Sequence, residues 1–547
     1  MSMDRIPNPP AATKVHGTKY PDRGVWITWI ISFLVVILTQ WYAESLDFAV
    51  VNMLMAGGIF ACSLAPFIWF VWYSSYSPFA RRSGFYLTLA ALGILLSIVR
   101  IDRFDGSLRP EFRFVWQQTR DQLLGKPIAG EVPEPEVDPA SPAVPATVEV
   151  GFPQFLGPNR NAYVSGPKLK TDWKKDPPRE LWRVPIGAGW GAFAAHSGRA
   201  VTLEQRGNEE YVTCYDVATG KVVWAHGIVA RHQEIMGGVG PRSTPTIHAG
   251  KVYTQGALGM IHCFELSTGK IVWKKDLLEL TGVKPSEDQN AILWGRSGSP
   301  LIYGDLCVIP AGGPATGPAV SLIAFDKQTG DIVWKGGDQQ TGYSSPTVAT
   351  LHGVEQILIV NEASVAGHDP ADGKELWRFA WFGGSTSTAT VSQPHPVGDN
   401  RVFISKAYGG GMKLLQVNKE GDVWSTEVAA QNGAVMKTKF TNATIIGDYA
   451  YALSDSILEC VEWKTGKAQW KKGRFGQGQL LGVGDVLLIQ AESGEVVLVA
   501  ATPEKQQELT RFSAIKGITW NNPCLYGKLL LVRNGEEAAC FELAVEE

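Results

Sequence analysis

Residues 215–224, YDVATGKVVW, decide the fold because this stretch returns along the chain. A degenerate copy, VNKEGDVW at residues 417–424, has lost positions but keeps the glycine and the tryptophan. The clear copies are FELSTGKIVW at 264–273, FDKQTGDIVW at 325–334, HDPADGKELW at 368–377 and VEWKTGKAQW at 461–470. Self-similarity of this kind marks a repeat architecture.

Each copy reads as a strand, a tight turn and a second strand. The Thr219-Gly220 pair supplies the turn, since glycine accepts the positive φ that a hairpin needs. Val222, Val223 and Trp224 then resume in residues that favour strands. A second hairpin of the same kind, PTIHAGKVY at residues 245–253, lies upstream of the next copy. Each unit therefore holds four short strands.

The spacing of the repeat tryptophans indicates a β-propeller. A period of about 40–50 residues with four strands per unit is typical of that architecture. The observed steps are 42, 49, 61, 43, 47 and 46 residues, between Trp182, Trp224, Trp273, Trp334, Trp377, Trp424 and Trp470. The 61-residue step contains an insertion at 277–290, which is predicted to be a surface loop. Unrelated hairpins in a sandwich are the alternative, and they would not explain the period.

The two ends of the repeat region complete each other. The last unit, residues 519–543, runs out before its fourth strand, whereas residues 181–184 form a fourth strand with no preceding three. Pairing them closes the ring and leaves no open sheet edge between first and last units. The prediction is an all-β, eight-bladed propeller over residues 149–547, preceded by an N-terminal bundle of transmembrane helices.

Three apolar runs support that bundle, which we place at residues 24–99. The runs cover 24–42, 48–73 and 84–99, and none has an internal Lys, Arg, Asp or Glu. About 20 apolar residues span the hydrocarbon core of a bilayer. Residues 1–23 are polar or Pro-rich and are predicted to be disordered. Net charge is −3, so composition gives no overall attraction to nucleic acid.

Basic residues in the flanks predict the orientation of the helices. Four precede the first helix, two lie between the second and third, and the first loop, 43–47, has none. This favours a cytoplasmic N-terminus and an exported propeller. Five arginines between Arg100 and Arg120 favour the opposite orientation, which stays open.

Two segments connect the helices to the propeller. Residues 100–126 are predicted to be a juxtamembrane helical segment, with one helix over 109–124 and apolar contacts from Phe112, Trp116 and Leu123. Residues 127–148 form a Pro-rich linker, with six prolines between Pro127 and Pro145. Such a composition gives an extended spacer, which would hold the propeller away from the membrane.

Four of the seven cysteines occupy the same position in their repeats, two residues before an acidic residue. They are Cys214, Cys263, Cys460 and Cys540. Equivalent positions lie on different blades, so we interpret them as small buried hydrophobes and not as a disulfide framework.

Residues that precede the first strand of each unit should face one funnel at the central channel. They include four bases and two tryptophans, a set that would suit a flat, polycarboxylated ligand. The candidate binding residues are Arg242, Trp294, Arg296, Lys437, Lys439, Gln477, Trp520 and Asn521, together with Tyr343, Gln393, Asn442 and Gln479. The alternative is that these side chains fill the channel, hydrogen-bond within it or present a polar binding face.

Other chemistry-bearing residues give weaker signals. Glu204 with Arg206 could be a buried ion pair or an acid–base pair, and one carboxylate without a partner favours the first. No metal-ligand spacing links the histidines His226, His232, His248 and His262. We therefore assign no catalytic residue and no metal site from the sequence.

The pattern Asp-x-x-Thr-Gly-x-x-x-Trp resembles the pyrroloquinoline-quinone-like (PQQ-like) repeat of eight-bladed propellers. Quinoprotein alcohol and glucose dehydrogenases share it with the propeller lipoprotein of the bacterial outer-membrane β-barrel assembly machinery. The resemblance covers residues 150–547. The segment FPQFLGPNR at 152–160 also looks like the segment before the ring in many bacterial PQQ-like repeat proteins.

The resemblance implies one of two functions. The first is a membrane-anchored, non-catalytic binding or scaffolding module in cell-envelope or outer-membrane protein assembly, with envelope proteins as partners. The alternative is a membrane-bound PQQ-dependent alcohol or sugar dehydrogenase that binds PQQ with Ca²⁺ and passes electrons to membrane quinone. Both imply a multi-pass protein of the bacterial inner membrane with an external propeller. A ligand sensor that signals through the helices is a third idea.

Three departures from the dehydrogenase pattern favour the binding module. The sequence has no adjacent Cys-Cys pair. In the quinoprotein alcohol dehydrogenases, a disulfide between two such cysteines resembles a lid over the cofactor. It shows no Glu, Asn and Asp set at the family's Ca²⁺-binding positions. It also lacks a Cys-x-x-Cys-His haem motif, so an electron acceptor would have to be another molecule.

Overall fold

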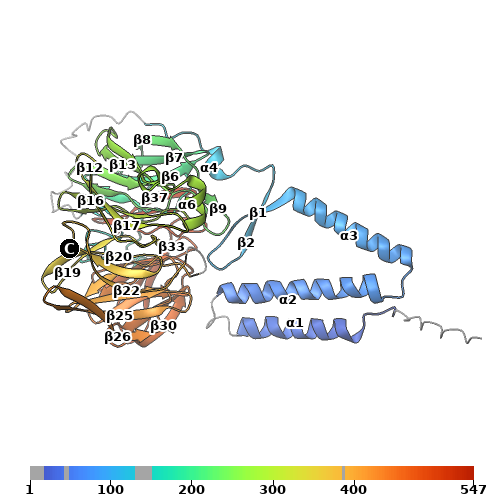
Figure 1. Ribbon diagram of the computed structural model, residues 1–547. Coiled ribbons are helices and arrows are strands. Elements are labelled where there is room, and N and C mark those ends of the chain that lie inside the picture. The colour runs from blue at the N-terminus through green and yellow to red at the C-terminus, as the bar shows by residue number, and fades with distance from the viewer. Residues whose placement is uncertain (1–17, 42–47, 130–150, 385–387, 547) are drawn as a thin grey trace, which may run out of the picture. The chain divides into compact units, whose positions relative to one another are not determined.

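The computed structural model describes residues 18–41, 48–129, 151–384 and 388–546. It divides into two compact units (Figure 1). The first comprises residues 1–102 and 107–117, and the second comprises 103–106 and 118–547. The predicted disorder of residues 1–23 falls largely outside the described residues, which begin at residue 18.

The first unit contains three helices that are long and apolar enough to cross a membrane. They are α1 (Arg23–Trp41), α2 (Phe48–Ile68), which a π-helical turn η1 (Trp69–Tyr73) continues, and α3 (Pro78–Ile98). The indole Nε1 of Trp29 on α1 donates to the carbonyl of Cys62 on α2 at 2.9 Å. The three apolar runs of the sequence therefore form the predicted helices.

A β-hairpin follows α3 where the sequence pattern led us to expect a helix. Strands β1 (Val99–Phe104) and β2 (Pro110–Phe114) form a two-stranded sheet, and only one helical turn, α4 (Arg120–Leu123), forms further on. The prediction of one helix over 109–124 is therefore wrong. Alternating β-branched and aromatic residues favour strands here, and Arg113 Nε donates to Asp102 Oδ1 across the hairpin at 2.8 Å.

The second unit contains the propeller (Figure 1). Each of its eight sheets has four antiparallel strands in sequence from the inside outward, and the sheet of blade 7 gains a fifth, parallel strand at its inner edge. Blade 1 is β5 (Ala194–His196), β6 (Arg199–Arg206), β7 (Glu209–Asp216) and β8 (Val222–Val229); blade 2 is β11 (Thr246–His248), β12 (Lys251–Gln255), β13 (Met260–Glu265) and β14 (Ile271–Asp276); blade 3 is β15 (Leu301–Tyr303), β16 (Leu306–Gly312), β17 (Val320–Asp326) and β18 (Ile332–Gly336); blade 4 is β19 (Thr347–Leu351), β20 (Val354–Val360), β21 (Ser364–His368) and β22 (Glu375–Ala380). The repeat tryptophans lie on the outermost strands.

The remaining blades follow the same order. Blade 5 is β23 (His395–Val397), β24 (Arg401–Lys406), β25 (Gly411–Glu420) and β26 (Val423–Asn432); blade 6 is β27 (Thr444–Ile446), β28 (Tyr449–Ser454), β29 (Ile457–Glu462) and β30 (Lys467–Arg474); blade 7 is β31 (Gln479–Val483), β32 (Val486–Gln490), β33 (Glu495–Ala500) and β34 (Glu508–Ser513); blade 8 is β35 (Cys524–Tyr526), β36 (Leu529–Arg533), β37 (Glu537–Glu542) and β4 (Arg179–Pro185). The short strands β9 (Gln233–Glu234) and β10 (Gly238–Val239) pair with each other between blades 1 and 2.

Blade 8 closes the ring as the sequence predicted. Its outermost strand, β4, comes from the N-terminal side of the repeat region and pairs antiparallel with β37, with Trp182 opposite Cys540. The propeller therefore has eight blades. The insertion at 277–290, expected as a surface loop, folds into two short helices, α5 (Leu277–Thr281) and α6 (Pro285–Ala291).

The repeat residues hold neighbouring blades together. The indole Nε1 of Trp224 in blade 1 donates to the carbonyl of Leu266 in blade 2 at 2.8 Å, and Trp273 in blade 2 reaches Lys327 of blade 3 in the same way at 3.1 Å. Four of the seven indoles also cover the turn glycine of the next blade, in the pairs Trp182–Gly220, Trp224–Gly269, Trp273–Gly330 and Trp334–Gly373. A Cβ on Gly269 would lie 2.5 Å from the Trp224 ring. The Thr-Gly and Trp of the repeat are therefore the two halves of one contact between blades.

We expect Gly269→Ala to destabilise the propeller by about 2–4 kcal/mol, because the new methyl group strains a residue with φ of +70° and also meets the Trp224 ring. Gly250→Ala is the matched control, since Gly250 turns the preceding hairpin of blade 2 with φ of +74° and has open space around it. That control should cost only about 1 kcal/mol. Chemical unfolding of the two variants measures the difference, and equal losses would contradict the contact.

The four repeated cysteines are buried and free, as predicted. Each lies opposite the tryptophan of its own blade, as Cys214 does with Trp224 and Cys263 with Trp273. Burial raises the pKa of the Cys214 thiol to about 12, so it stays protonated at neutral pH. These thiols act as small core side chains.

The segment before the ring runs along the innermost strands. Phe152 exchanges backbone hydrogen bonds with Ala195 of blade 1, and the N–H of Ile247 in blade 2 donates to Pro153. The Arg160 side chain, 2% exposed, donates to the carbonyls of Ser299 and Pro300 at 3.0 and 2.8 Å. The chain then adds β3 (Tyr163–Val164) parallel to β31 of blade 7. This segment thereby ties blades 1, 2, 3 and 7 together from the inside.

The chain reaches the second unit upstream of the Pro-rich linker. Residues 118–129 already belong to that unit, where buried Asp121 accepts from Arg231 at 2.6 Å and Arg206 donates to the carbonyl of Gly125 at 3.0 Å. The linker at 127–148, most of which lies outside the described residues, therefore joins two segments of the second unit. It does not join the helices to the propeller as the sequence interpretation had it.

Candidate functional site

Three aromatic side chains meet where the innermost strands begin. The ring centroids of Trp190 and Trp520 are 4.6 Å apart, and those of Phe440 and Trp520 are 5.0 Å apart. Trp520 was a candidate from the sequence. Trp190 and Phe440 were missed, although both precede a first strand in the same way.

A carboxylate organises the polar side of this cluster. Glu492 Oε1 accepts from the indole Nε1 of Trp520 at 2.8 Å, and Glu492 Oε2 accepts from the backbone N–H of Gln477 at 2.9 Å. We call Trp190, Phe440, Gln477, Glu492 and Trp520 the mouth of the propeller. Glu492 lies between β32 and β33, so a search restricted to residues before first strands could not find it.

A segment of the same chain covers the mouth. The N–H of Gly106 donates to Glu492 Oε1 at 2.7 Å, and the N–H of Phe104 donates to the carbonyl of Ile235 at 3.1 Å. Arg103 approaches Glu536 at 3.8 Å. Residues 103–106, which we call the tip, therefore contact loops of several blades at once.

Arg242, Trp294 and Tyr343 form a second group. The rings of Trp294 and Tyr343 are 5.3 Å apart, and the Tyr343 hydroxyl accepts from the backbone N–H of Trp294 at 3.3 Å. Arg242 donates to the carbonyls of Gly240 and Gly237 at 2.6 and 3.0 Å. Burial lowers the pKa of Arg242 to about 10, so it remains a cation at neutral pH. Its hydrogen bonds go to backbone and hold the loop between blades 1 and 2.

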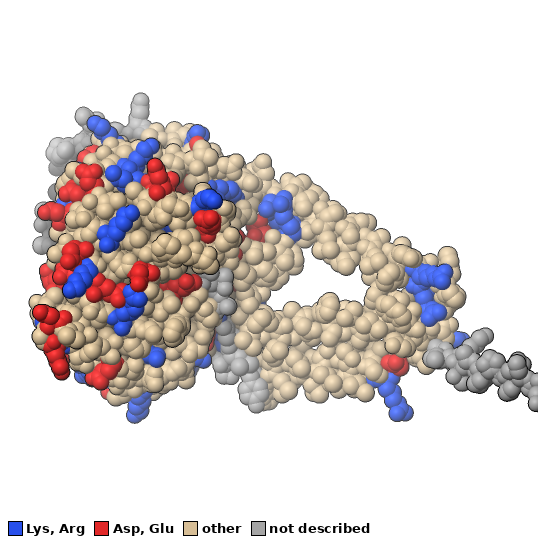
Figure 2. Space-filling view, viewed as in Figure 1, with Lys and Arg blue, Asp and Glu red and all other residues tan. Residues whose placement is uncertain are grey.

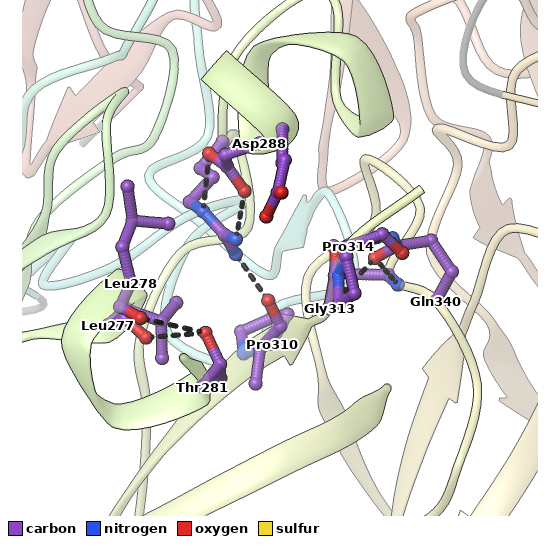
Figure 3. Close-up of polar contacts among 12 residues, drawn as sticks. Leu277, Leu278, Thr281, Asp288, Pro310, Gly313, Pro314 and Gln340 are labelled. Atoms are coloured by element: carbon purple, nitrogen blue, oxygen red, sulfur yellow. Dashed lines mark hydrogen bonds and ion pairs between the residues drawn. The ribbon is translucent and has the colours of Figure 1, made fainter. Parts of the chain in front are cut away.

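Arg296 is occupied by an ion pair. Its guanidinium binds Asp288 on α6, which Figure 3 labels, through two contacts of 2.5 and 3.3 Å. It also donates to the carbonyl of Ala311. Arg296 is 2% exposed. The helix that the insertion forms thus supplies the counter-ion for a base that the sequence had placed in the funnel.

The other candidates also hold the chain together. Asn521 donates to the carbonyls of Gly189 and Gly191 at 3.1 and 2.8 Å. Lys437 pairs with Asp455 at 3.7 Å, and Lys439 is half-buried. The remaining contacts run from Gln477 to Ser456, from Gln479 to Trp520 and Phe440, from Gln393 to Arg160, and from the Gln393 N–H to Asn442. Some of the candidate residues from the sequence therefore line the mouth, and the others make contacts that fix loops.

The polar atoms in and around the mouth decide what kind of ligand could bind there. Among the described residues, no group of three or more His, Cys, Asp and Glu side chains could hold a metal ion. Arg296 and Lys437 already neutralise carboxylates, and Glu492 adds a negative charge at the mouth itself. The amide oxygens of Gln477, Gln479 and Asn521 are buried without a protein partner, so they suit hydrogen-bond donors. These oxygens could accept from a ligand that donates hydrogen bonds, and they are also of the type that binds a hard cation.

Glu204 and Arg206 form an ion pair of 3.3 Å, in which Glu204 is fully buried. Glu204 also accepts from the N–H of Gly187, the hydroxyl of Thr213 and the hydroxyl of Tyr215 at 2.5, 2.5 and 3.0 Å. A carboxylate satisfied on all sides is structural, which is the first of the two interpretations that the sequence allowed.

Comparison with known proteins supports the repeat. A repeat-family model described as "Outer membrane protein assembly factor BamB" matches residues 208–472. No curated protein sequence matches the chain.

Several solved structures are similar in fold. A europium-containing methanol dehydrogenase is 12% identical, with a TM-score of 0.54, over 72% of this chain and 99% of its own. The quinohemoprotein alcohol dehydrogenase ADHIIG from Pseudomonas putida HK5 is 11% identical, with a TM-score of 0.52, over 73% and 81%. BamB from Moraxella catarrhalis is 14% identical, with a TM-score of 0.48, over 67% and 100%. The propeller of this chain thus carries the PQQ-like β-propeller repeat, as its sequence predicted.

Proposed function

We propose that the protein is a membrane-anchored PQQ-like propeller that acts as a non-catalytic binding or scaffolding module for other envelope proteins. One observation carries the proposal: the carboxylate of Glu492 at the mouth is engaged by the chain itself, with hydrogen bonds from Trp520, Gln477 and Gly106. A mouth that already binds a polypeptide loop suits protein recognition.

Two further observations support a role in cell-envelope or outer-membrane protein assembly. The repeat-family model that matches residues 208–472 is described as an assembly factor. Three helices long and apolar enough to cross a membrane precede the propeller. The basic residues before α1 support the bacterial inner membrane, with the propeller on the periplasmic side.

The surface of the propeller also suits a protein partner. Lysines and arginines are interspersed with aspartates and glutamates on the face in view (Figure 2). Phe382, which follows β22, is 77% exposed. Exposed aromatic side chains of this kind anchor protein–protein interfaces.

The alternative is a membrane-bound PQQ-dependent alcohol or sugar dehydrogenase. Its support is the shared fold of the methanol and alcohol dehydrogenase structures, which have the higher TM-scores. In that case PQQ with Ca²⁺ would have to bind at the mouth and displace the tip.

The test uses the full chain in detergent and in cells. Purified protein is mixed with PQQ and Ca²⁺, and quinone binding and dye-linked oxidation of alcohols and sugars are recorded. We expect neither. In cells, a photo-crosslinking residue at Phe382 should give one discrete adduct with an envelope protein. The same residue at Val423, which is 71% exposed on an outer strand, should give none. Stoichiometric quinone binding with turnover would establish the dehydrogenase instead.

A further inference from the structure

The strongest unexplained feature of the second unit is the way the tip fits the mouth. Gly106 is the residue in contact, and a Cβ on it would lie 2.4 Å from Gln477 Cγ and 2.6 Å from Glu492 Oε1. Only glycine can occupy this position without moving either side chain. The mouth and the tip are therefore complementary in shape as well as in hydrogen bonding.

The Glu492 carboxylate is a hydrogen-bond acceptor for three N–H groups. Its carboxylate accepts from Gly106, from the Trp520 indole and from the backbone of Gln477, at 2.7, 2.8 and 2.9 Å. Two of these donors belong to the propeller and hold the carboxylate in place. The third comes from the tip and shares Oε1 with the Trp520 indole. Hydrogen bonds to a charged acceptor are stronger than those between neutral groups.

The tip is held at two more places. The Phe104 N–H donates to Ile235 at 3.1 Å, and Arg103 approaches Glu536 at 3.8 Å. Ile235 lies between blades 1 and 2, and Glu536 lies between β36 and β37 of blade 8, so the tip contacts loops of several blades. These contacts are the kind that a bound peptide makes, with backbone donors supplying affinity and one close-fitting glycine supplying specificity.

We propose that the tip is an intramolecular ligand of the mouth, and that the mouth recognises a polypeptide turn that presents the N–H of a glycine. The proposal rests on the function proposed above and adds its regulation. A partner protein carrying such a turn has to displace residues 103–106. A tethered ligand competes at an effective concentration in the millimolar range. The tip therefore strongly lowers the apparent affinity of the mouth for a turn of another protein until the tip is released.

The test uses the full chain in detergent and a labelled probe peptide, RFDGSL, which is the sequence of residues 103–108. Gly106→Leu should expel the tip, because its side chain overlaps Gln477 and Glu492. Phe104→Pro is a second release variant, since proline removes the N–H that Ile235 accepts. Gly125→Leu is the matched control, because Gly125 lies in the same connecting region with open space around it.

We expect both release variants to bind the probe at least tenfold more tightly than the wild type and the control, by fluorescence anisotropy. Adding Glu492→Gln to Gly106→Leu should remove that gain, and the peptide RFDLSL should not bind. Hydrogen exchange of residues 103–108 should be slow in the wild type and fast in the release variants. Equal exchange in all forms would overturn the intramolecular ligand, and release without probe binding would overturn the recognition site. Either failure leaves the Phe382 adduct and the quinone assay unaffected, so the two proposals fail separately.

Discussion

Replacing Arg533 with alanine is expected to lower the free energy of unfolding by about 3–5 kcal/mol, the cost of leaving buried partners without their cation. Arg533 ends β36 in blade 8 and is 1% exposed. Its guanidinium donates to the hydroxyl of Thr202 at 2.6 Å and to the carbonyls of Leu203 and Gly187, both at 2.9 Å. All three acceptors lie in blade 1 or in the loop that leads into it.

The size of the expected effect follows from where these contacts lie. Blade 8, whose strand β4 closes the ring, meets blade 1 here, and the guanidinium donates to all three buried acceptors. Burial lowers the pKa of Arg533 to about 10, so it remains a cation at neutral pH. The buried carboxylate of Glu204, with Arg206 beside it, lies in the same network. Removing Arg533 therefore leaves buried oxygens without this donor and takes one cation from the surroundings of Glu204.

Two variants sharpen this test, which is measured by chemical unfolding followed through near-UV circular dichroism. Arg533→Lys should recover only part of the loss, because an ammonium cannot reproduce the fork of donors. Arg511→Ala is the control, since Arg511 makes ion pairs with Glu508 and Glu495 on exposed outer strands. Exposed pairs of this kind contribute about 0–1 kcal/mol. If Arg533→Ala cost no more than Arg511→Ala, the seam would not depend on this residue.

The fold could be predicted because its determinants repeat. From blade 8 through blade 3, each repeat tryptophan meets the turn glycine of the next blade, so the period of Trp224 and Gly269 in the sequence is also the period of those contacts in space. Ring closure followed from the incomplete units at the two ends. Burial of the repeated cysteines could be predicted for the same reason, since equivalent positions have equivalent surroundings.

The candidate site could be predicted only in part because its contacts do not repeat. Gly106 and Glu492 are 386 residues apart in sequence, and neither belongs to the repeat. Arg296 carries the right charge at the right place in its unit, but an insertion found in that unit alone supplies Asp288. The hairpin β1–β2 was missed because arginines and aromatic residues at 109–124 also suit a helix. Single, long-range contacts of this kind leave no pattern in one sequence.

Glu210→Gln is expected to stabilise the protein by about 3 kcal/mol above pH 8, with an effect that fades toward pH 4.5. Glu210 lies on β7 and is 4% exposed, and its carboxylate accepts from the N–H of Ala257 at 3.1 Å. Burial raises the pKa of Glu210 from 4.5 to about 7. It lines a cavity of about 10 Å³ with Thr254, His226 and His262, about the space that one water molecule needs.

The sign follows from the proton balance. Between pH 4.5 and 7 the folded protein keeps the Glu210 proton while the unfolded chain releases it, so the stability that this carboxyl contributes is lost as the pH rises through 7. A glutamine does not titrate and still offers an oxygen to Ala257. The difference in unfolding free energy between variant and wild type should therefore grow with pH and level off above the folded pKa.

The histidines around this cavity change the pH dependence of stability in the direction opposite to Glu210. Burial lowers the pKa of His262 to about 4 and also lowers that of His226, so stability that depends on the neutral rings increases as the pH rises toward 6.5. The wild type and the Glu210→Gln variant share this contribution of the histidines. It cancels in the difference between their free energies of unfolding once the rings are neutral in folded and unfolded chains. Unfolding curves collected from pH 6.5 to 9 therefore isolate Glu210.

Glu209→Gln gives the matched control one residue away. Its carboxylate accepts from the Tyr211 hydroxyl at 2.6 Å, and this bond, with a further one from Lys126, lowers the pKa of Glu209. A carboxyl with a lowered pKa stabilises the folded state at neutral pH, so its removal should destabilise the protein or leave it unchanged. Glu210→Gln should therefore raise the free energy of unfolding at neutral pH, whereas Glu209→Gln should lower it or leave it unchanged. A Glu210→Gln difference that is flat from pH 6.5 to 9 would show that the buried carboxyl does not titrate in this range.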